Sequence, residues 1–176
     1  PQPEAVDAGA DILNLGGNAI DAAIACAFVQ GVVDPLMCGI GGFGSMQLFM
    51  PKLKVHECID FHGKAPEKAT PNMWADRIEG EARDGFGFIL KDHINDIGYQ
   101  SITAPGSLKA YYEAHRDYGV LDWKTILQPA IEYAENGWVV RPHVDFWWSI
   151  KNHFGRTPNP DRVKFSNPGR DLYCDA

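Results

Sequence analysis

Features that would assign a partner or a compartment directly are missing from this chain. No apolar run approaches the roughly 18 to 20 residues that cross a bilayer, and the opening Pro1-Gln2-Pro3-Glu4 lacks the basic and apolar regions of a signal peptide. Basic residues are in the minority, with 16 Lys and Arg against 23 Asp and Glu and a net charge of -7. We therefore expect neither a membrane nor a nucleic acid as a partner, because phosphate backbones are bound by basic surfaces.

Cysteine pairs and nucleophile motifs are also missing. The 4 cysteines, Cys26, Cys38, Cys58 and Cys174, form no C-x-x-C pair, so neither a zinc site nor a disulfide framework is indicated. We expect them to act as small buried apolar residues. The chain has no P-loop and no G-x-S-x-G nucleophile elbow. Motifs alone therefore reveal no catalytic residue.

What the chain does have is the composition of a globular protein. Its 176 residues are 45% hydrophobic and 22% charged, which excludes wholesale disorder. At about 100 to 200 residues per domain, this length fits one domain or a piece of a larger protein.

Two helices and a strand hairpin are expected in the first third of the chain. Apolar residues recur at helical spacing over residues 4–15, and Gly16 follows where a left-handed cap is needed. The next helix, capped by Asn18, is apolar almost all round and should be buried. Alternating segments at 45–50 and 53–61 predict a hairpin.

The rest of the chain is mostly helical by its pattern. Residues 66–105 carry mixed charges and scattered glycines and indicate a surface excursion with short helical pieces. Beyond it, Ser107 and Asp122 are expected to cap the two helices of a helical hairpin, the second kinked or restarted at Pro129. A third helix is expected after Pro142.

A glycine-rich loop lies between the buried helix and the strand hairpin. Gly39, Gly41 and Gly44 satisfy G-x-G-x-x-G, and Gly42 adds a further glycine. The dinucleotide-binding fingerprint needs a strand before the glycines and a helix after them, and here the order is reversed. We expect a structural loop that turns tightly and packs closely, with no nucleotide bound.

Four potential metal ligands alternate along the second predicted strand. His56, Cys58, Asp60 and His62 would share one face of an extended strand. Neighbours two apart lie about 7 Å from each other, whereas those four apart lie about 13 Å away, so the strand alone supplies at most two ligands to one ion. We expect no metal site here and favour a half-buried strand that leads into a functional loop.

A resemblance to a known family runs through roughly residues 4–150. The residues that carry it stand in order along the chain: Gly9-Ala10-Asp11-Ile12-Leu13, Gly16-Gly17-Asn18-Ala19-Ile20-Asp21-Ala22-Ala23, Asp34-Pro35, Gly39-Ile40-Gly41-Gly42-Phe43-Gly44, Asp60-Phe61, Ala65-Pro66, Pro105-Gly106-Ser107, Tyr118-Gly119 and Gln128-Pro129-Ala130 with Gly137. This combination resembles the N-terminal part of the large subunit of gamma-glutamyltransferases, also called gamma-glutamyltranspeptidases. Each piece alone is weak, and their common order makes the pattern specific.

The resemblance implies a fold and a chemistry. Family members are precursors that cleave themselves into a large and a small subunit, and they form the αββα sandwich of N-terminal nucleophile hydrolases. Residues 1–176 would then be a single partial domain of α/β (α+β) class, helix-rich with a strand hairpin. The nucleophile is a threonine that opens the small subunit, so we expect no catalytic residue in this chain, no activity of this chain alone, no cofactor, and the small subunit as a partner.

The same resemblance points to a substrate-binding loop. In the family an arginine after Asp-Phe grips the α-carboxylate of the gamma-glutamyl group, because a planar guanidinium matches a carboxylate with two hydrogen bonds. This chain has His62 at that place, between Asp60 and Lys64. We expect these three residues to bind substrate. Three alternatives follow: the histidine binds the α-carboxylate more weakly than an arginine would, Lys64 binds it instead, or the loop binds another acyl group.

Two alternatives to a gamma-glutamyl enzyme stay open. A related, cephalosporin-acylase-like amide acylase with a non-glutamyl substrate would fit the histidine, and a non-catalytic binding module would fit the lack of a visible nucleophile. In either enzyme the substrate is a small molecule with an amide bond. The family is often exported, which suggests a periplasmic or extracellular location.

Overall fold

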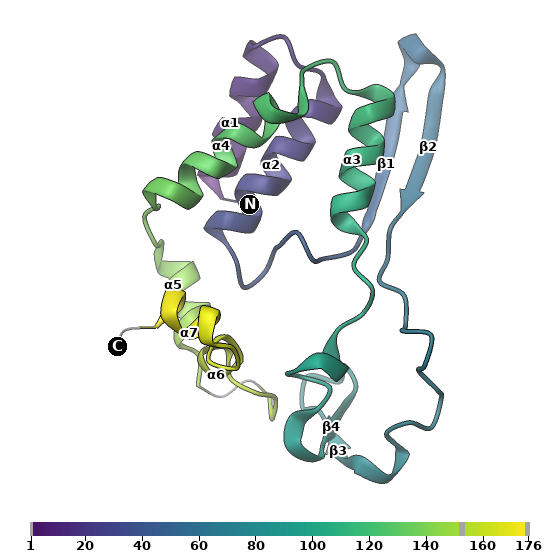
Figure 1. The fold of residues 1–176 in the computed structure, drawn as a ribbon, viewed down its shortest axis with the longest axis vertical. Coiled ribbons are helices and arrows are strands. Elements are labelled where there is room, and N and C mark those ends of the chain that lie inside the picture. Colours follow the sequence, from purple (N-terminus) through teal and green to yellow (C-terminus); the bar gives the residue numbers. More distant parts are fainter. Residues whose placement is uncertain (1, 152–153, 175–176) are drawn as a thin grey trace. The chain divides into compact units, whose positions relative to one another are not determined.

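The computed structural model describes residues 2–151 and 154–174, which form two compact units. One unit comprises residues 1–64 and 104–140, and the other residues 65–103 and 141–176. The first unit contains the helices and strands α1 (Pro3–Asn14), α2 (Ala19–Val33), β1 (Ser45–Met50), β2 (Val55–Asp60), α3 (Ser107–Tyr118) and α4 (Trp123–Asn136) (Figure 1). The second contains β3 (Ile78–Glu81), β4 (Phe88–Leu90), α5 (Pro142–Ser149), α6 (Asn159–Val163) and α7 (Asn167–Tyr173). That both belong to one partial domain of a larger protein stays a prediction.

Helix α2 is the centre of the first unit. Asn18 caps it, because its side chain accepts hydrogen bonds from the backbone amides of Ile20 and Asp21 while the Asp21 carboxylate accepts from the Asn18 amide. Helix α1 ends just before Gly16, whose φ of 93° is the left-handed conformation expected there. Helices α1, α3 and α4 all pack on α2.

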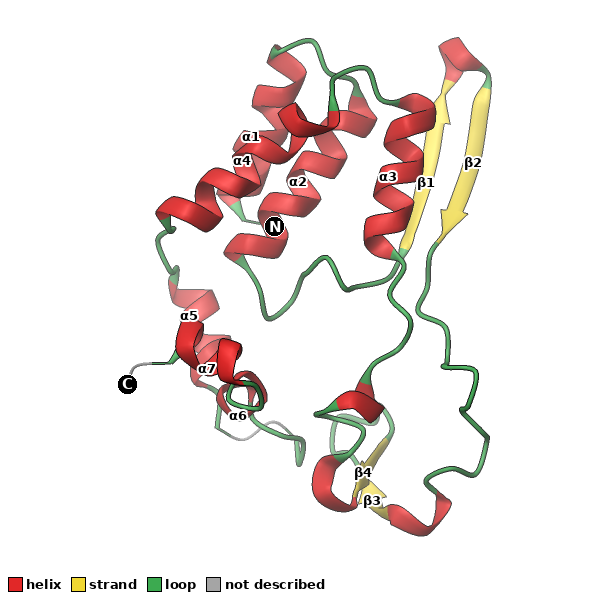
Figure 2. Ribbon diagram, viewed as in Figure 1, coloured by secondary structure: helices red, strands yellow, loops and turns green. Residues whose placement is uncertain are grey.

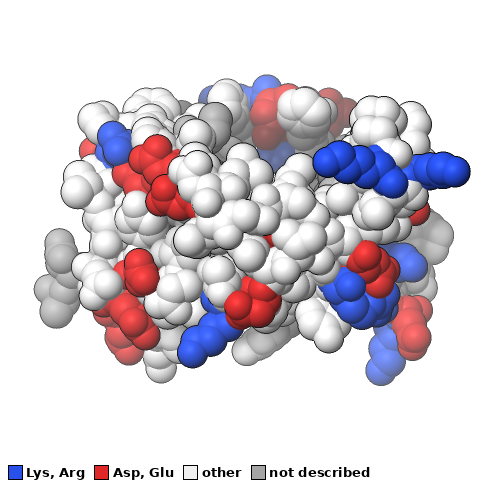
Figure 3. Space-filling view, turned by 90° about the horizontal axis from the view of Figure 1, so that it is seen from above, with Lys and Arg blue, Asp and Glu red and all other residues white. Residues whose placement is uncertain are grey.

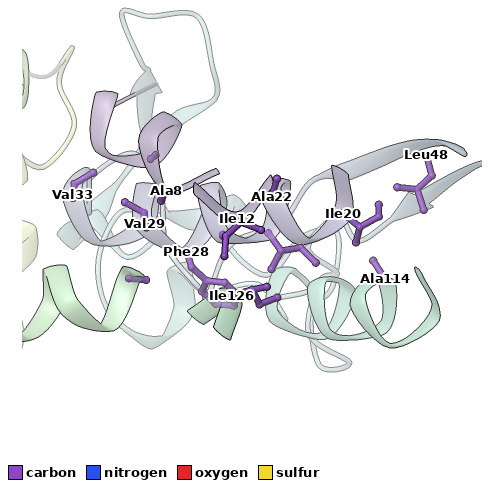
Figure 4. Close-up of a cluster of buried hydrophobic side chains, with 14 residues drawn as sticks. Ala8, Ile12, Ile20, Ala22, Phe28, Val29, Val33, Leu48, Ala114 and Ile126 are labelled. Atoms are coloured by element: carbon purple, nitrogen blue, oxygen red, sulfur yellow. The ribbon is translucent and has the colours of Figure 1, made fainter. Parts of the chain in front are cut away.

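The core of this unit lies around α2. Figure 4 shows its buried side chains, which come from all four helices and from β1. Ile24, Val29 and Ile126 are completely buried. Gly9 of α1 leaves room for Cys26 of α2, because a Cβ added at Gly9 would stand 2.3 Å from the Cys26 Sγ. The prediction of a buried second helix is confirmed.

The strand hairpin is also confirmed. Strands β1 and β2 pair antiparallel, with Ser45 opposite Asp60 and Met50 opposite Val55, and a short 3-10 turn at Pro51–Leu53 joins them (Figure 2). Alternate residues face opposite sides of such a pair, so Leu48 points into the core. Phe49 is 70% exposed on the other face.

Helices α3 and α4 differ in detail from the prediction. Asp122 caps α4 through the Thr125 amide as expected, but Gly106 is the cap residue of α3 and Ser107 is its first helical residue. Ser107 therefore does not cap the helix. Helix α4 runs without interruption through Pro129, and α3 and α4 lie against α2 rather than forming a separate helical hairpin.

The second unit contains structure that periodicity did not reveal. Within the predicted excursion, β3 and β4 form a small antiparallel hairpin, and α6 and α7 lie in the C-terminal stretch, where the sequence shows no period. Arg156 joins the two chain segments of this unit, since its Nε lies 2.9 Å from Asp84 Oδ2 and its Nη1 3.5 Å from Asp96 Oδ1. This ion-pair network holds the Asp84 pKa below its ordinary value, chiefly through the Arg156 hydrogen bond.

The surface carries charges of both signs. Lysine, arginine and acidic side chains are interspersed on the face that Figure 3 shows. None of the helices built from described residues is long and apolar enough to span a bilayer.

The buried carboxylate of Asp21 should be essential to stability. It accepts from the amides of Asn18, Val120 and Leu121 and lies 3.6 Å from His115 Nε2. Replacing Asp21 by Ala leaves these donors without an acceptor, so we expect the free energy of unfolding to fall by about 3 kcal/mol in urea denaturation. Asp7→Ala, on the exposed side of α1, is the control and should change it by less than about 0.5 kcal/mol. Equal effects of the two variants would contradict this role.

Candidate substrate-binding site

The predicted substrate loop follows directly from β2. Asp60 is the last residue of this strand, and its Oδ1 accepts hydrogen bonds from the His62 backbone amide at 3.1 Å and from the His62 ring Nδ1 at 2.9 Å. Because a carboxylate only accepts, Nδ1 carries the hydrogen and Nε2 is the ring atom left for a ligand. Both side chains are exposed, at 62% for His62 and 75% for Asp60.

Electrostatics favour the ionised form of Asp60. Its pKa lies below the ordinary value because of the hydrogen bond from the His62 amide, then that from the His62 ring, with smaller contributions from the charges of His62 and Lys64. The structure thus brings Asp60 and His62 together. Lys64 is exposed and joins the loop to the segment before α3, since its carbonyl accepts the Ala104 amide at 3.0 Å.

Of the four alternating residues, His56, Cys58 and Asp60 lie in β2 and His62 follows the strand. No group of three or more His, Cys, Asp or Glu residues able to hold an ion occurs in the described part of the chain. The His56 ring instead packs against Phe49 with 5.5 Å between ring centroids. Cys58 is exposed on the same face, so the expectation of a buried cysteine is wrong there.

The glycine loop packs closely against α3 and the substrate loop. The Gly42 carbonyl accepts the amides of Gly106 and Ser107, at 3.0 and 3.2 Å. A Cβ on Gly44 would stand 3.3 Å from the Phe61 ring. A Cβ added at Gly39 or Gly41 would meet no atom within 4 Å, so close approach at the Cβ position explains only part of the motif. The helix-loop-strand order predicted for this segment is confirmed.

A cleft of about 580 Å³ opens between this loop and α3. Its lining includes Phe43, Ser107 and Tyr111, together with Gln30 and Cys38 from the end of α2 and the turn that follows. Burial is the main cause that raises the Cys38 pKa, followed by the charge of Asp34. The Phe43 ring also lies 5.6 Å from the His62 ring, centroid to centroid, so the cleft and the substrate loop are adjacent.

Sequence reasoning missed the cleft-lining residues Phe43 and Ser107. In the sequence, Phe43 stands within the glycine-rich segment, and Ser107 stands at a predicted helix start and in the segment Pro105-Gly106-Ser107. The short segment Pro105-Gly106-Ser107 carried the available signal, since a glycine before a helix allows close backbone approach. A Cβ on Gly106 would indeed stand 2.4 Å from the Phe61 carbonyl oxygen.

Comparison with known proteins identifies the family. The family model described as gamma-glutamyltranspeptidase matches residues 5–173, nearly the whole chain. The chain belongs to the gamma-glutamyltranspeptidase family. The resemblance to the N-terminal part of the large subunit is thereby confirmed.

The relatives of this gamma-glutamyltranspeptidase-family chain include proteins named as acylases and proteins named as glutathione hydrolases. The Acylase ACY 1 proenzyme of Pseudomonas sp. (strain V22) is 41% identical over 145 residues, which are 81% of this chain and 25% of the relative. The glutathione hydrolase proenzyme of Bacillus subtilis (strain 168) is 38% identical over 138 residues, 78% of this chain and 22% of the relative. The chain thus spans about a quarter of the length of these relatives.

Solved structures of the family confirm the fold class. The Helicobacter pylori gamma-glutamyltranspeptidase superposes with a TM-score of 0.78 at 27% identity, covering 98% of this chain and 44% of that one. The cephalosporin acylase from Bacillus halodurans gives a TM-score of 0.71 at 34% identity, covering 93% of this chain and 26% of that one. The predicted fold class, an α/β fragment of an N-terminal nucleophile hydrolase fold, is therefore confirmed.

The contact between Asp60 and His62 can be tested in solution. We expect an NMR titration to place the Asp60 carboxyl pKa below the ordinary value of about 3.9. In His62→Ala this pKa should rise only part of the way back, because the backbone amide of residue 62 still donates. His56→Ala, which removes a histidine from the same strand, should leave it unchanged. An Asp60 pKa unaffected by loss of the His62 ring would show that the pair does not form.

Proposed function

We propose that this chain is the substrate-binding part of an enzyme that hydrolyses or transfers a gamma-glutamyl group, such as that of glutathione, through an acyl-enzyme. The observation that carries the proposal is the family match over residues 5–173, together with the relatives named glutathione hydrolase. The nucleophile is a threonine outside this chain, at the start of a small subunit cut from the same precursor. No residue in this chain acts as the nucleophile, so its contribution is binding and orientation.

The loop after β2 binds the acyl group in this proposal. His62 meets the substrate through Nε2, since Asp60 occupies Nδ1 and sets the ring orientation. The charge of Asp60 offsets that of a protonated His62, so the pair holds a carboxylate less firmly than an arginine would. Lys64, two residues further on and exposed, supplies a second cation for the same group.

An amide acylase with a non-glutamyl substrate is the second candidate. Two observations favour it: the histidine in place of the family's arginine, and the 41% identity to a relative named Acylase ACY 1 proenzyme. An acyl group without an α-carboxylate has no need of a guanidinium. Comparing turnover of a gamma-glutamyl anilide with that of an acyl anilide lacking the α-carboxylate separates the two candidates.

The complete polypeptide that contains these residues should process itself and turn over substrate. We expect one internal cleavage that exposes an N-terminal threonine, visible by mass spectrometry and N-terminal sequencing, because the hydroxyl needs its own amine as base. The processed protein should release the amine from a gamma-glutamyl anilide, whereas the 176 residues alone should not. A complete polypeptide that stays uncleaved and releases no amine from the anilide would contradict the proposal.

The charge at position 62 should control gamma-glutamyl affinity. We expect His62→Arg to lower the KM of the complete protein for a gamma-glutamyl anilide roughly tenfold, because a guanidinium is permanently charged and offers a carboxylate two hydrogen bonds. His62→Ala should raise this KM, because the ring donor is lost. Equal KM values for the three proteins would exclude His62 from the site.

A further inference from the structure

The pairing of β1 and β2 continues beyond the hairpin into the glycine loop and the substrate loop. One step past the last strand pair, the Gly44 carbonyl accepts the Phe61 amide at 3.0 Å. A further step in the same register places Phe43 opposite His62, and their ring centroids lie 5.6 Å apart. The contact between these two rings is therefore a cross-strand pair that extends the hairpin.

Phe43, Asp60 and His62 share one face of this extended pair. Side chains alternate between the two faces of paired strands, and all three of these are exposed. Asp60 Oδ1 contacts the His62 Nδ1 at 2.9 Å, and the Phe43 ring lies beside the imidazole with 40° between the ring planes. A free exposed side chain changes rotamer readily. Contacts with two different partners therefore restrict the orientation of the His62 ring.

The backbone that carries Phe43 is held on both sides. The Gly42 carbonyl accepts two amides at the start of α3, and the Gly44 carbonyl accepts the Phe61 amide. None of these hydrogen bonds uses the Phe43 side chain, which is 62% exposed. Truncation of this side chain should therefore leave the loop and the fold in place.

A second pair of phenylalanine and histidine occurs on the same face of the hairpin. Phe49 lies opposite His56, and their ring centroids are 5.5 Å apart. The cross-strand relation is the same in both pairs, but Phe43 lines the cleft and Phe49 does not. Phe49 is also exposed to a similar extent, at 70%. The hairpin thus contains a matched control for the loss of an aromatic ring beside a histidine.

We propose that Phe43 is a positioning residue for His62: its ring holds the imidazole in one orientation, so that Nε2 is in place for the acyl group of the substrate. Aromatic pairs across strands stabilise a particular arrangement of their rings. A phenyl ring has no hydrogen-bond donor for a carboxylate, so Phe43 acts on substrate binding through the histidine. This inference rests on the proposed function, which assigns the acyl group to His62.

The kinetic test is a double-mutant cycle in the complete processed protein, with a gamma-glutamyl anilide as substrate. We expect Phe43→Ala to raise KM roughly fivefold, because the ring that orders the imidazole is lost. In the His62→Ala background the same change should alter KM less than about twofold, since a residue that acts through the imidazole has no effect once it is gone. Phe43→Tyr keeps the ring and should retain the wild-type KM. Phe49→Ala is the matched control and should leave KM unchanged.

A measurement without substrate tests the placement of the ring by itself. The His62 ring is one of the donors that hold the Asp60 pKa below its ordinary value. We expect Phe43→Ala to raise the Asp60 pKa, followed by NMR titration, toward its value in His62→Ala, because an imidazole without its neighbour spends less time on Oδ1. Phe49→Ala should leave the Asp60 pKa unchanged.

Two outcomes would overturn the proposal. One is an effect of Phe43→Ala on KM that is the same with and without the His62 imidazole, because Phe43 would then not act through the histidine. The other is an Asp60 pKa that does not respond to Phe43→Ala. A response of the Asp60 pKa in a complete protein that does not turn over the anilide would contradict the proposed function and still support the placement of His62 by Phe43.

Discussion

The carboxylate of Asp21 ties together the elements on which the candidate site depends. It closes the capping box at the start of α2 and accepts from the amides of the turn between α3 and α4. Helix α3 is therefore anchored to α2 at its C-terminal end, while its N-terminal end holds Gly42 of the glycine loop. The cleft lies at that second end, so the buried Asp21 carboxylate anchors the far end of a helix that lines the cleft.

The features that the sequence predicted well are governed by neighbours in the chain. Asn18 caps α2, Gly16 follows α1 in a left-handed conformation, and Asp122 caps α4, each through contacts within three or four residues. The hairpin followed from its alternating pattern, and with it the placement of Asp60 and His62 at one strand end. Local contacts were sufficient to place the loop after β2, and its role in binding substrate stays a prediction.

The features that it missed depend on contacts between distant segments. Ser107 would be a good cap by its type, but the Gly42 carbonyl, 65 residues away, takes its amide, and its side chain turns into a cleft. The second unit is similar, because Arg156 reaches Asp84 and Asp96 across more than 55 residues. Periodicity contains no information about such pairs, and the glycine-rich, mixed-charge stretch that holds β3 and β4 gives no alternation to recognise.

The pairing of His62 with Asp60 bears on how the proposed site can hold a carboxylate. An arginine brings one permanent charge, whereas Asp60 contacts the His62 ring at 2.9 Å and offsets any positive charge on it. In the proposed function Lys64, exposed two residues further on, then supplies the cation that the pair does not. The exchange of arginine for histidine thus weakens the proposed grip on the acyl side and leaves a cation in the same loop.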